Sequence, residues 1–286
     1  MNKDEFDLVA DKTAGALIRA SSCFRTDKYD AYKAAIETDD GLSCWAMEQI
    51  VENAHIAEKD SSPLCDDTGI PHVILEVGRN RQISGMTLEA VQEGIRRGLR
   101  RLPGRPMAVK GDDKQRIDQS LGLFEDSEEV LPAPFTIRYS DDEERLRLHI
   151  LMLGGGPEIR ARTYRVFHRH SIDIVLSEIT GWAVESVSQL GCSPCTLAVG
   201  IGRSHYEASN LMLQAMAEGR YDRQSEYEKY ITGEVNKSNT GALGLGGKMS
   251  VLATFMKIGP QRASGVRIVC MRPCCCFEPR VYSVDL

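Results

Sequence analysis

The spacing of apolar residues changes partway along the chain, and this change limits the fold more than any other feature. Up to about residue 102, apolar positions recur at intervals near 3.6, with one short strand-like run at 72–77. This spacing predicts helices over residues 4–21, 28–38, 41–59 and 86–102. From Pro134 the interval becomes two, and the alternating runs 135–139 and 146–151 flank a polar segment, which predicts a β-hairpin. We therefore expect an α+β fold in which a helical N-terminal part packs with a mixed sheet.

The second half of the chain adds two helices and one strand, predicted over residues 171–190, 204–218 and 249–255. Both helices are followed by a glycine, Gly191 and Gly219, as is common where helices end. A glycine-rich loop at 240–247 precedes the strand. Because no internal repeat or low-complexity linker interrupts the sequence, we predict a single domain over residues 1–286.

Charge and hydropathy argue against several classes of protein. The formal net charge is −6, whereas a nucleic-acid binder usually presents a basic face. No apolar run is long enough to span a membrane, and residues 1–7 are charged without a secretory apolar stretch behind them. We therefore expect a cytoplasmic protein. The arginine-rich stretch 96–105 is interpreted mainly as a solvated helix face, with one arginine as an alternative ligand for a carboxylate.

Cysteine is the unusual residue, with nine in the chain. Disulfides rarely persist in a reducing cytoplasm, so such a count favours metal binding or catalysis. Cys23 and Cys44 lie in helical surroundings and are interpreted as core residues, whereas the other seven are assigned to loop-like or glycine-rich positions. Three loops hold six of the seven, at Cys65, at Cys192 and Cys195, and at Cys274, Cys275 and Cys276.

These three loops are far apart in sequence, which does not fit a zinc ribbon with its two close cysteine pairs. Three thiolates gathered from distant loops fit an iron–sulfur cluster better. A cluster with three protein thiolates leaves one iron open as a Lewis acid. The alternative that these are unrelated buried thiols stays open on spacing alone. The histidines form no paired metal-ligand motif, and His168 and His170 are interpreted as polar surface.

Acidic and glycine-rich segments give weaker signals. Asp66 and Asp67 follow a cysteine directly, where such a pair marks a turn or helix cap, or else orients a substrate hydroxyl and assists proton transfer. The glycine runs at 154–156 and 244–247 lack P-loop spacing, although backbone N–H groups in such loops can hold a substrate carboxylate. Position alone does not decide between these roles.

Taken together, the segments resemble the α subunit of the class I fumarase and L-tartrate dehydratase family. Pro63-Leu64-Cys65-Asp66-Asp67-Thr68-Gly69 is similar to the family's Pro-x-Cys-Gln-Asp-Thr-Gly, and Gly154-Gly155-Gly156-Pro157-Glu158 to its Lys-Gly-Gly-Gly-Ser-Glu-Asn. Gly191-Cys192-Ser193-Pro194 is similar to its Cys-Pro-Pro. Further short segments keep the family's order along nearly the whole chain, namely Asn53-Ala54, Val199-Gly200-Ile201-Gly202, Gly244-Leu245-Gly246-Gly247-Lys248 and Ala263-Ser264.

The resemblance implies a [4Fe–4S] cluster held by Cys65, Cys192 and one cysteine near the C-terminus. Cys276 is chosen because Cys276-Phe277-Glu278-Pro279-Arg280 matches the family's Cys-aromatic-x-x-Arg. Cys274 and Cys275 are the fallback ligands. Cys195 stands where the family has an ordinary apolar or aromatic residue, and we treat it as an extra.

The resemblance also implies reversible hydration or dehydration of a small hydroxy-acid such as malate, tartrate or a related compound. Asp67 is the implied proton-transfer or hydroxyl-positioning group. The implied substrate-binding residues are Asp66, Arg105, Gly155 and Gly156. In single-chain relatives a further domain supplies the base, whereas this chain stops at Leu286. The resemblance therefore implies a separate β subunit and a dimer of α–β pairs.

Several positions depart from the family pattern around the expected substrate. Asp66 replaces a glutamine, and Leu153, Pro157 and Ile159 replace a lysine, a serine and an asparagine. The segment at 260–264 lacks the family's histidine. We interpret these changes as altered substrate choice. The alternatives are a non-catalytic or regulatory relative that keeps the fold and cluster, and, more weakly, a structural zinc protein.

Overall fold

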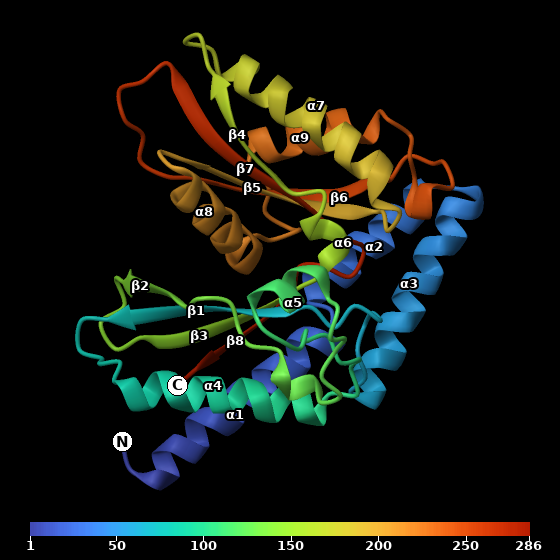
Figure 1. Cartoon of the computed structure of the whole chain (residues 1–286). Helices are drawn as coiled ribbons and strands as arrows, with labels where there is room; N and C mark the ends of the chain where they lie inside the picture. Colours follow the sequence, from blue (N-terminus) through green and yellow to red (C-terminus); the bar gives the residue numbers. More distant parts are fainter. The chain divides into compact units, whose positions relative to one another are not determined.

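The computed structural model describes all 286 residues and divides into two compact units (Figure 1). Unit 1 consists of Met1–Cys23, Ala54–Gly154 and Arg280–Leu286, and unit 2 consists of Phe24–Asn53 and Gly155–Pro279. Each unit contains helices and its own four-stranded sheet, which confirms the predicted α+β class. None of the helices combines the length and the apolar character that crossing a membrane requires.

Unit 1 is a sheet of strand order β2-β1-β3-β8 with two long helices on one face (Figure 1). Its main elements are α1 (Lys3–Ser22), β1 (Ile70–Gly78), α4 (Gly85–Arg101), β2 (Thr136–Ser140), β3 (Leu146–Leu153) and β8 (Arg280–Asp285). Every second residue of β3, at Leu148, Ile150 and Met152, is fully buried against Leu17 of α1 and Leu99 of α4. The apolar residues that recur every two positions in β3 and about every 3.6 positions in α1 and α4 therefore pack into one core.

The predicted hairpin is wrong, although both of its strands exist. β1 lies between β2 and β3, parallel to the first and antiparallel to the second. The connection between β2 and β3 crosses the end of β1 at Gly78, whose N–H donates to the carbonyl of Arg145 at 2.7 Å. A Cβ on Gly78 would lie 2.2 Å from the carbonyl oxygen of Asp142, so only glycine admits this crossing. Alternation reveals strands but not their neighbours.

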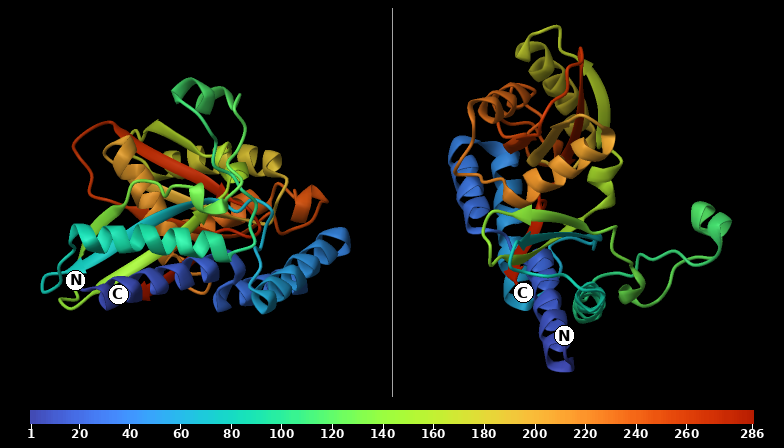
Figure 2. Two further views of the ribbon diagram at one scale, coloured as in Figure 1. Left: turned by 60° about the horizontal axis from the view of Figure 1, so that its bottom comes forward. Right: turned by 90° about the vertical axis from the view of Figure 1, so that its left-hand side faces the viewer.

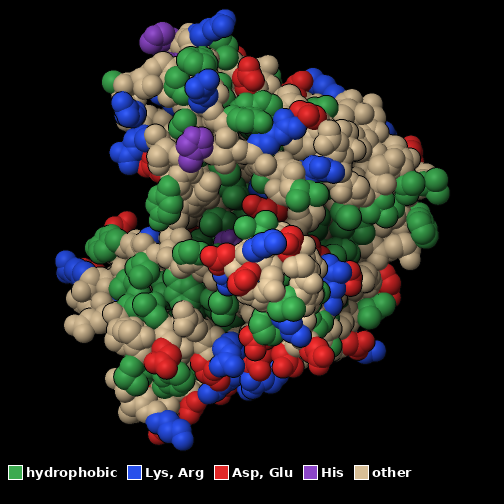
Figure 3. Space-filling model, viewed as in Figure 1, with side chains coloured by type: hydrophobic (Ala, Val, Ile, Leu, Met, Phe, Trp, Pro, Cys, Tyr) green, Lys and Arg blue, Asp and Glu red, His purple; other side chains and the backbone are tan.

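The arginine-rich stretch is mainly a solvated helix face, as predicted. Arg97 of α4 lies 2.8 Å from Asp7 and 3.2 Å from Asp11, both of α1. Figure 3 shows blue and red side chains interspersed along the α1 and α4 surface. Arg105 lies beyond the end of α4. From there a long connection carries α5 (Asp113–Asp118) away from α4 (Figure 2).

Unit 2 is a sheet of strand order β4-β7-β5-β6 with helices on both faces (Figure 1). Its main elements are β4 (Arg162–Phe167), α7 (Ile172–Leu190), β5 (Cys195–Gly202), α8 (His205–Glu218), α9 (Glu226–Asn236), β6 (Val251–Ile258) and β7 (Val266–Cys274). α8 packs against β5 and β7, with α7 and α9 on the opposite face. A Cβ on Gly200 would lie 2.0 Å from the carbonyl oxygen of Ala208, so α8 rests directly on the β5 backbone.

Local signals located the long helices of unit 2 correctly. Ser171 caps α7 by accepting a hydrogen bond from the N–H of Asp173, and Gly191 ends it with φ of 76°. Strands β4, β5, β7 and β8 were not predicted; β5 is buried at every residue, so its sequence does not alternate. The remaining elements are α2 (Thr26–Thr38), α3 (Gly41–Asp60), α6 (Gly155–Glu158) and the 3-10 turns η1 (Ser127–Glu129) and η2 (Ala242–Gly244).

Candidate active site

The first cysteine loop, residues 63–69, lies in unit 1 between α3 and β1. A buried arginine donates hydrogen bonds to its backbone. Arg280 is 2% exposed. Its Nη1 donates to the carbonyls of Asp67 at 2.7 Å and Thr68 at 3.2 Å, and its Nε donates to the carbonyl of Met152 at 3.1 Å. The sequence matched Arg280 to the family only as the last residue of a motif. The structure makes it the residue that fixes the backbone of this loop.

Two glycines allow the loop to pack this closely. Gly69 has φ of 85°, and a Cβ there would lie 2.6 Å from Arg280 Nη2. A Cβ on Gly104 would lie 2.7 Å from the hydroxyl of Thr68, which donates to the carbonyl of Arg105 at 3.3 Å. The segment around Arg105 is therefore fixed against the cysteine loop within unit 1.

Asp66 and Arg105, both predicted from the sequence as substrate-binding, lie together at the surface of this loop. Arg105 Nη1 is 3.2 Å from Asp66 Oδ2, and the two side chains are 55% and 81% exposed. An exposed ion pair of this kind contributes roughly 0–1 kcal/mol to stability. One nitrogen of the Arg105 guanidinium is therefore already engaged by a carboxylate of the same chain. Cys65 and Asp67 lie on the same loop.

The second and third cysteine loops, both in unit 2, are joined by their backbones. The N–H of Cys276 donates to the carbonyl of Cys192 at 2.8 Å. The glycine-rich loop closes on the same segment, since the N–H of Leu243 donates to the carbonyl of Ser193 at 3.0 Å and the Ser193 hydroxyl donates to the carbonyl of Gly241 at 2.5 Å. Cys192 is exposed and Cys276 is 2% exposed. Within unit 2, folding thus brings together two thiols 84 residues apart in the chain, from 192 to 276.

The assignment of seven cysteines to loop-like positions is wrong for three of them. Cys195 begins β5, Cys270 lies within β7 and Cys274 ends β7, and all three are buried. Burial raises the pKa of the Cys195 and Cys274 thiols well above the usual value. The sequence did not reveal these strands because they are buried on both faces and their residues do not alternate. It therefore did not reveal that these thiols lie in strands. Cys275 is partly exposed. A hydrogen bond with Cys275, together with burial, raises the pKa of Cys276.

Two polar side chains of helix α2 donate hydrogen bonds to the backbone of the third cysteine loop. Tyr32 donates to the carbonyl of Cys276 at 2.8 Å, and Lys28, one turn earlier, donates to the carbonyl of Glu278 at 2.8 Å. Lys28 is 1% exposed, and its ammonium lies 4.4 Å from the centre of the Phe24 ring. Burial lowers the pKa of Lys28 to about 8, while the charges of Cys275 and Cys276 act to raise it. Helical periodicity predicted this helix but gave no sign that a lysine would be buried.

Gly155 and Gly156, also predicted as substrate-binding, begin the short helix α6 in unit 2. A Cβ on Gly156 would meet no atom within 4 Å, so no close approach requires glycine there. Glu158 ends α6 and pairs with Arg272, which is fully buried and also lies 3.2 Å from Glu278. These charges hold α6, the end of β7 and the third cysteine loop together within unit 2.

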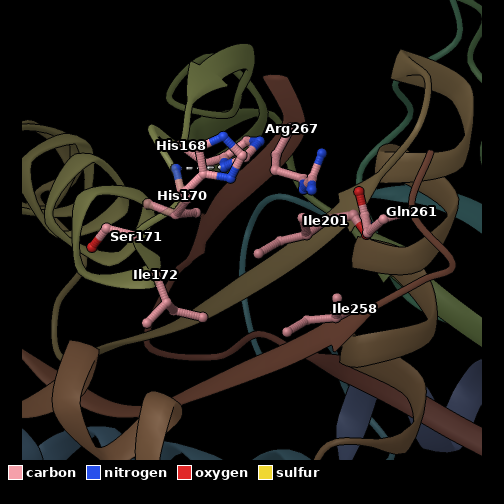
Figure 4. A pocket seen from close by; sticks show the side chains of 9 residues that line it. His168, His170, Ser171, Ile172, Ile201, Ile258, Gln261 and Arg267 are labelled. Atoms are coloured by element: carbon pink, nitrogen blue, oxygen red, sulfur yellow. Dashed lines mark hydrogen bonds between the residues drawn. The ribbon is translucent and has the colours of Figure 1, made fainter. Parts of the chain in front are cut away.

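Unit 2 also contains a cavity of about 330 Å³ that is lined by other residues (Figure 4). Its lining includes Ile201, at the end of β5 opposite Cys195 and six residues further along the strand, roughly 20 Å away at the usual rise per residue. His168 and His170 stand at its rim. His168 Nε2 donates to the carbonyl of Ser264 at 2.8 Å, and its Nδ1 accepts from the N–H of His170 at 3.0 Å. None of the site residues predicted from the sequence lines this cavity.

Comparisons with known proteins agree with the motifs. The fumarate hydratase (Fumerase) family matches residues 10–284. A protein of Methanocaldococcus jannaschii, provisionally named L(+)-tartrate dehydratase subunit alpha, is 27% identical over 241 residues, which cover 80% of this chain and 79% of that protein. A protein of Geobacillus stearothermophilus, provisionally named fumarate hydratase class I, is 26% identical over 222 residues, which cover 72% of this chain and 41% of that protein. With the family matching nearly its whole length, the chain belongs to the fumarate hydratase (Fumerase) family of hydro-lyases.

Proposed function

We propose that this chain is the α-type catalytic subunit of a [4Fe–4S]-dependent hydro-lyase, which adds water to an enoate or removes it from a small hydroxy-acid. The observation that carries the proposal is the pair of cysteine loops joined by the Cys276 to Cys192 backbone hydrogen bond above the buried ammonium of Lys28, in a chain of this family. Fumarate with malate, tartrate, or a close relative of these is the proposed substrate. Residues 1–286 act as one catalytic domain.

The donor chemistry of the cysteine loops fits an iron–sulfur cluster. Thiolates are the ligands such clusters take, and the buried cation beside the third loop suits an anionic group. No group of three or more metal-binding side chains is preassembled. Cys65 belongs to unit 1, and Cys192 and Cys276 belong to unit 2. Cys65, Cys192 and Cys276 are the proposed ligands. When bound, a cluster with one iron free of protein thiolates supplies a Lewis acid for the departing hydroxyl.

The chain's own polar groups then bind the substrate and move its proton. Asp67, fixed through its carbonyl by Arg280, is the proposed group that orients the substrate hydroxyl or transfers a proton. Arg105 keeps unused guanidinium donors after pairing with Asp66 and is the proposed clamp for a carboxylate. The backbone at Gly155 and Gly156 is proposed to contact the substrate as well.

A separate β subunit is the proposed partner. The Methanocaldococcus jannaschii relative is named as a subunit alpha, which implies another subunit of that enzyme. By the same logic this chain would form α–β pairs, two of which would make a dimer, in the cytoplasm. The base that removes the carbon-bound proton would then come from the β subunit.

The deciding experiment is anaerobic purification of the full chain, reconstitution with iron and sulfide, and assay with its β subunit. We expect a brown protein with broad absorbance at about 400 nm that bleaches in air, and hydration of at least one small enoate. A colourless protein without bound iron after reconstitution would contradict the proposal. Metal analysis separates this outcome from a zinc protein, and a loaded cluster without turnover would identify a non-catalytic relative.

Asp66→Gln is expected to strengthen binding of a dicarboxylate substrate. The substitution removes a negative charge and releases the guanidinium of Arg105, which lies 3.2 Å from Asp66. We expect KM for the dicarboxylate to fall about two- to fivefold with kcat changed less, as for relief of one exposed charge contact. Asp113→Asn is the matched control, because Asp113 is also exposed and paired with an arginine, Arg116. A higher KM in Asp66→Gln would instead show that Asp66 binds the substrate directly.

A further inference from the structure

Lys28 is held in unit 2 as a buried cation without a carboxylate of its own. It is 1% exposed and forms no ion pair with an aspartate or glutamate. Its hydrogen-bond acceptor is the neutral carbonyl of Glu278, at 2.8 Å. The carboxylate of the same Glu278 lies 3.2 Å from the fully buried Arg272. The ring of Phe24 adds only a weak attraction.

A buried ammonium of this kind is unfavourable unless a negative charge lies near it. The ionisable groups that act on Lys28 are, in decreasing order, the thiols of Cys275, Cys276 and Cys274 and the carboxylate of Glu278. The Glu278 carboxylate is already paired with the guanidinium of Arg272, at 3.2 Å. The protein by itself therefore forms no ion pair with Lys28 that would offset the cost of burying its charge. Three thiolates on an iron–sulfur core of charge 2+ carry a net negative charge, which would provide a matching anion.

We propose that Lys28 is the counter-charge of the anionic cluster at the third cysteine loop, and so governs both how firmly the cluster is kept and how easily it is reduced. The inference rests on the proposed function. Lys28 is a positioning residue, since it acts through the cluster and not on the substrate. Because reduction adds an electron, a nearby positive charge stabilises the reduced form, and removing that charge lowers the reduction potential.

Lys28→Met tests this, with Tyr32→Phe as the matched control. Methionine keeps the length and apolar stem of lysine without the charge. Tyr32→Phe removes the neighbouring hydrogen bond, to the carbonyl of Cys276 at 2.8 Å, from the same helix to the same loop without changing charge. The full chain is prepared with and without the reconstituted cluster. The readouts are the melting temperature without cluster, the rate of iron release to a chelator, and the reduction potential by anaerobic titration.

If Lys28 is the counter-charge, Lys28→Met should not destabilise the chain without the cluster but should weaken binding of the cluster when it is present. Without cluster, Lys28→Met is expected to melt at or above the wild-type temperature, because removing a buried charge that has no ion pair outweighs losing its hydrogen bond to the carbonyl of Glu278. Tyr32→Phe, which loses a hydrogen bond without removing a charge, is expected to melt lower. With cluster, Lys28→Met is expected to release iron at least tenfold faster and to have a lower reduction potential. Tyr32→Phe should stay within about threefold of wild type in release, with an unchanged potential.

The outcomes separate the inference from the proposed function. If the wild-type chain takes up no cluster, both are overturned. If the wild type takes up a cluster but Lys28→Met matches it in iron release and potential, the inference alone is overturned. If Lys28→Met and Tyr32→Phe behave alike in every readout, Lys28 is only an anchor for the loop. Should Lys28→Met prove insoluble, Lys28→Gln serves in its place with the same expectations.

Discussion

Replacing Arg280 by methionine is expected to lower the free energy of unfolding by about 4 kcal/mol. The guanidinium donates to three carbonyls, those of Met152, Asp67 and Thr68, and is 2% exposed. Losing the donor leaves these acceptors unsatisfied at roughly 1–3 kcal/mol each, offset in part by relief of a buried charge. Chemical denaturation followed by circular dichroism measures the change.

Arg79→Met is the control for Arg280→Met. Arg79 also lies in unit 1 and pairs with Glu143 at 2.5 Å, but it is 64% exposed, so its loss is expected to cost less than about 1 kcal/mol. Faster hydrogen exchange at residues 67–69 of Arg280→Met would show that the cysteine loop itself has loosened. A loss below about 1 kcal/mol with unchanged exchange would contradict the role given to Arg280.

Cys276→Ser is expected to abolish stable iron binding and to lower activity at least a hundredfold. A cluster held by three thiolates loses one ligand, and a serine hydroxyl is a far poorer donor to iron. Iron and sulfide content after anaerobic reconstitution, with hydration assayed beside the β subunit, measures both effects.

The neighbouring cysteines make this test decisive for the third ligand. Cys275→Ser is expected to keep iron content within about twofold of wild type, and Cys44→Ser, in helix α3, serves as a control remote in sequence. Cys274→Ser should keep the iron but lose stability, because Cys274 is fully buried at the end of β7. Loss of iron from Cys275→Ser, with iron retained in Cys276→Ser, would move the ligand to Cys275.

The sequence predicted the elements whose signals are local. Helices α1, α2, α3, α4, α7 and α8 were found to within about two residues, since periodicity and capping residues act over a few positions. Elements whose stability comes from long-range packing were missed. β5 and β7 are buried for most of their length and carry no alternation, and the order of strands in unit 1 depends on a connection passing over Gly78.

The sequence also gave no sign of the division into two units. The chain passes between units at residues 23–24, 53–54, 154–155 and 279–280, and one of these points lies inside helix α3. A boundary is visible in sequence when a flexible linker marks it, and a helix carries no such mark. That residues 1–286 form a single catalytic domain therefore stays a prediction.

For the candidate site, the sequence by itself determined the family and the chemical types present, because ordered motifs of cysteine, aspartate and glycine survive without reference to packing. Only the tertiary structure decided which cations are buried. Lys28, Arg272 and Arg280 are each at most 2% exposed, yet nothing in their local sequence separates them from solvated lysines and arginines. Burial depends on what the rest of the chain packs around a side chain. The cluster predicted from the cysteines thus acquired its candidate counter-charge, and the cysteine loop its anchor, only in the folded protein.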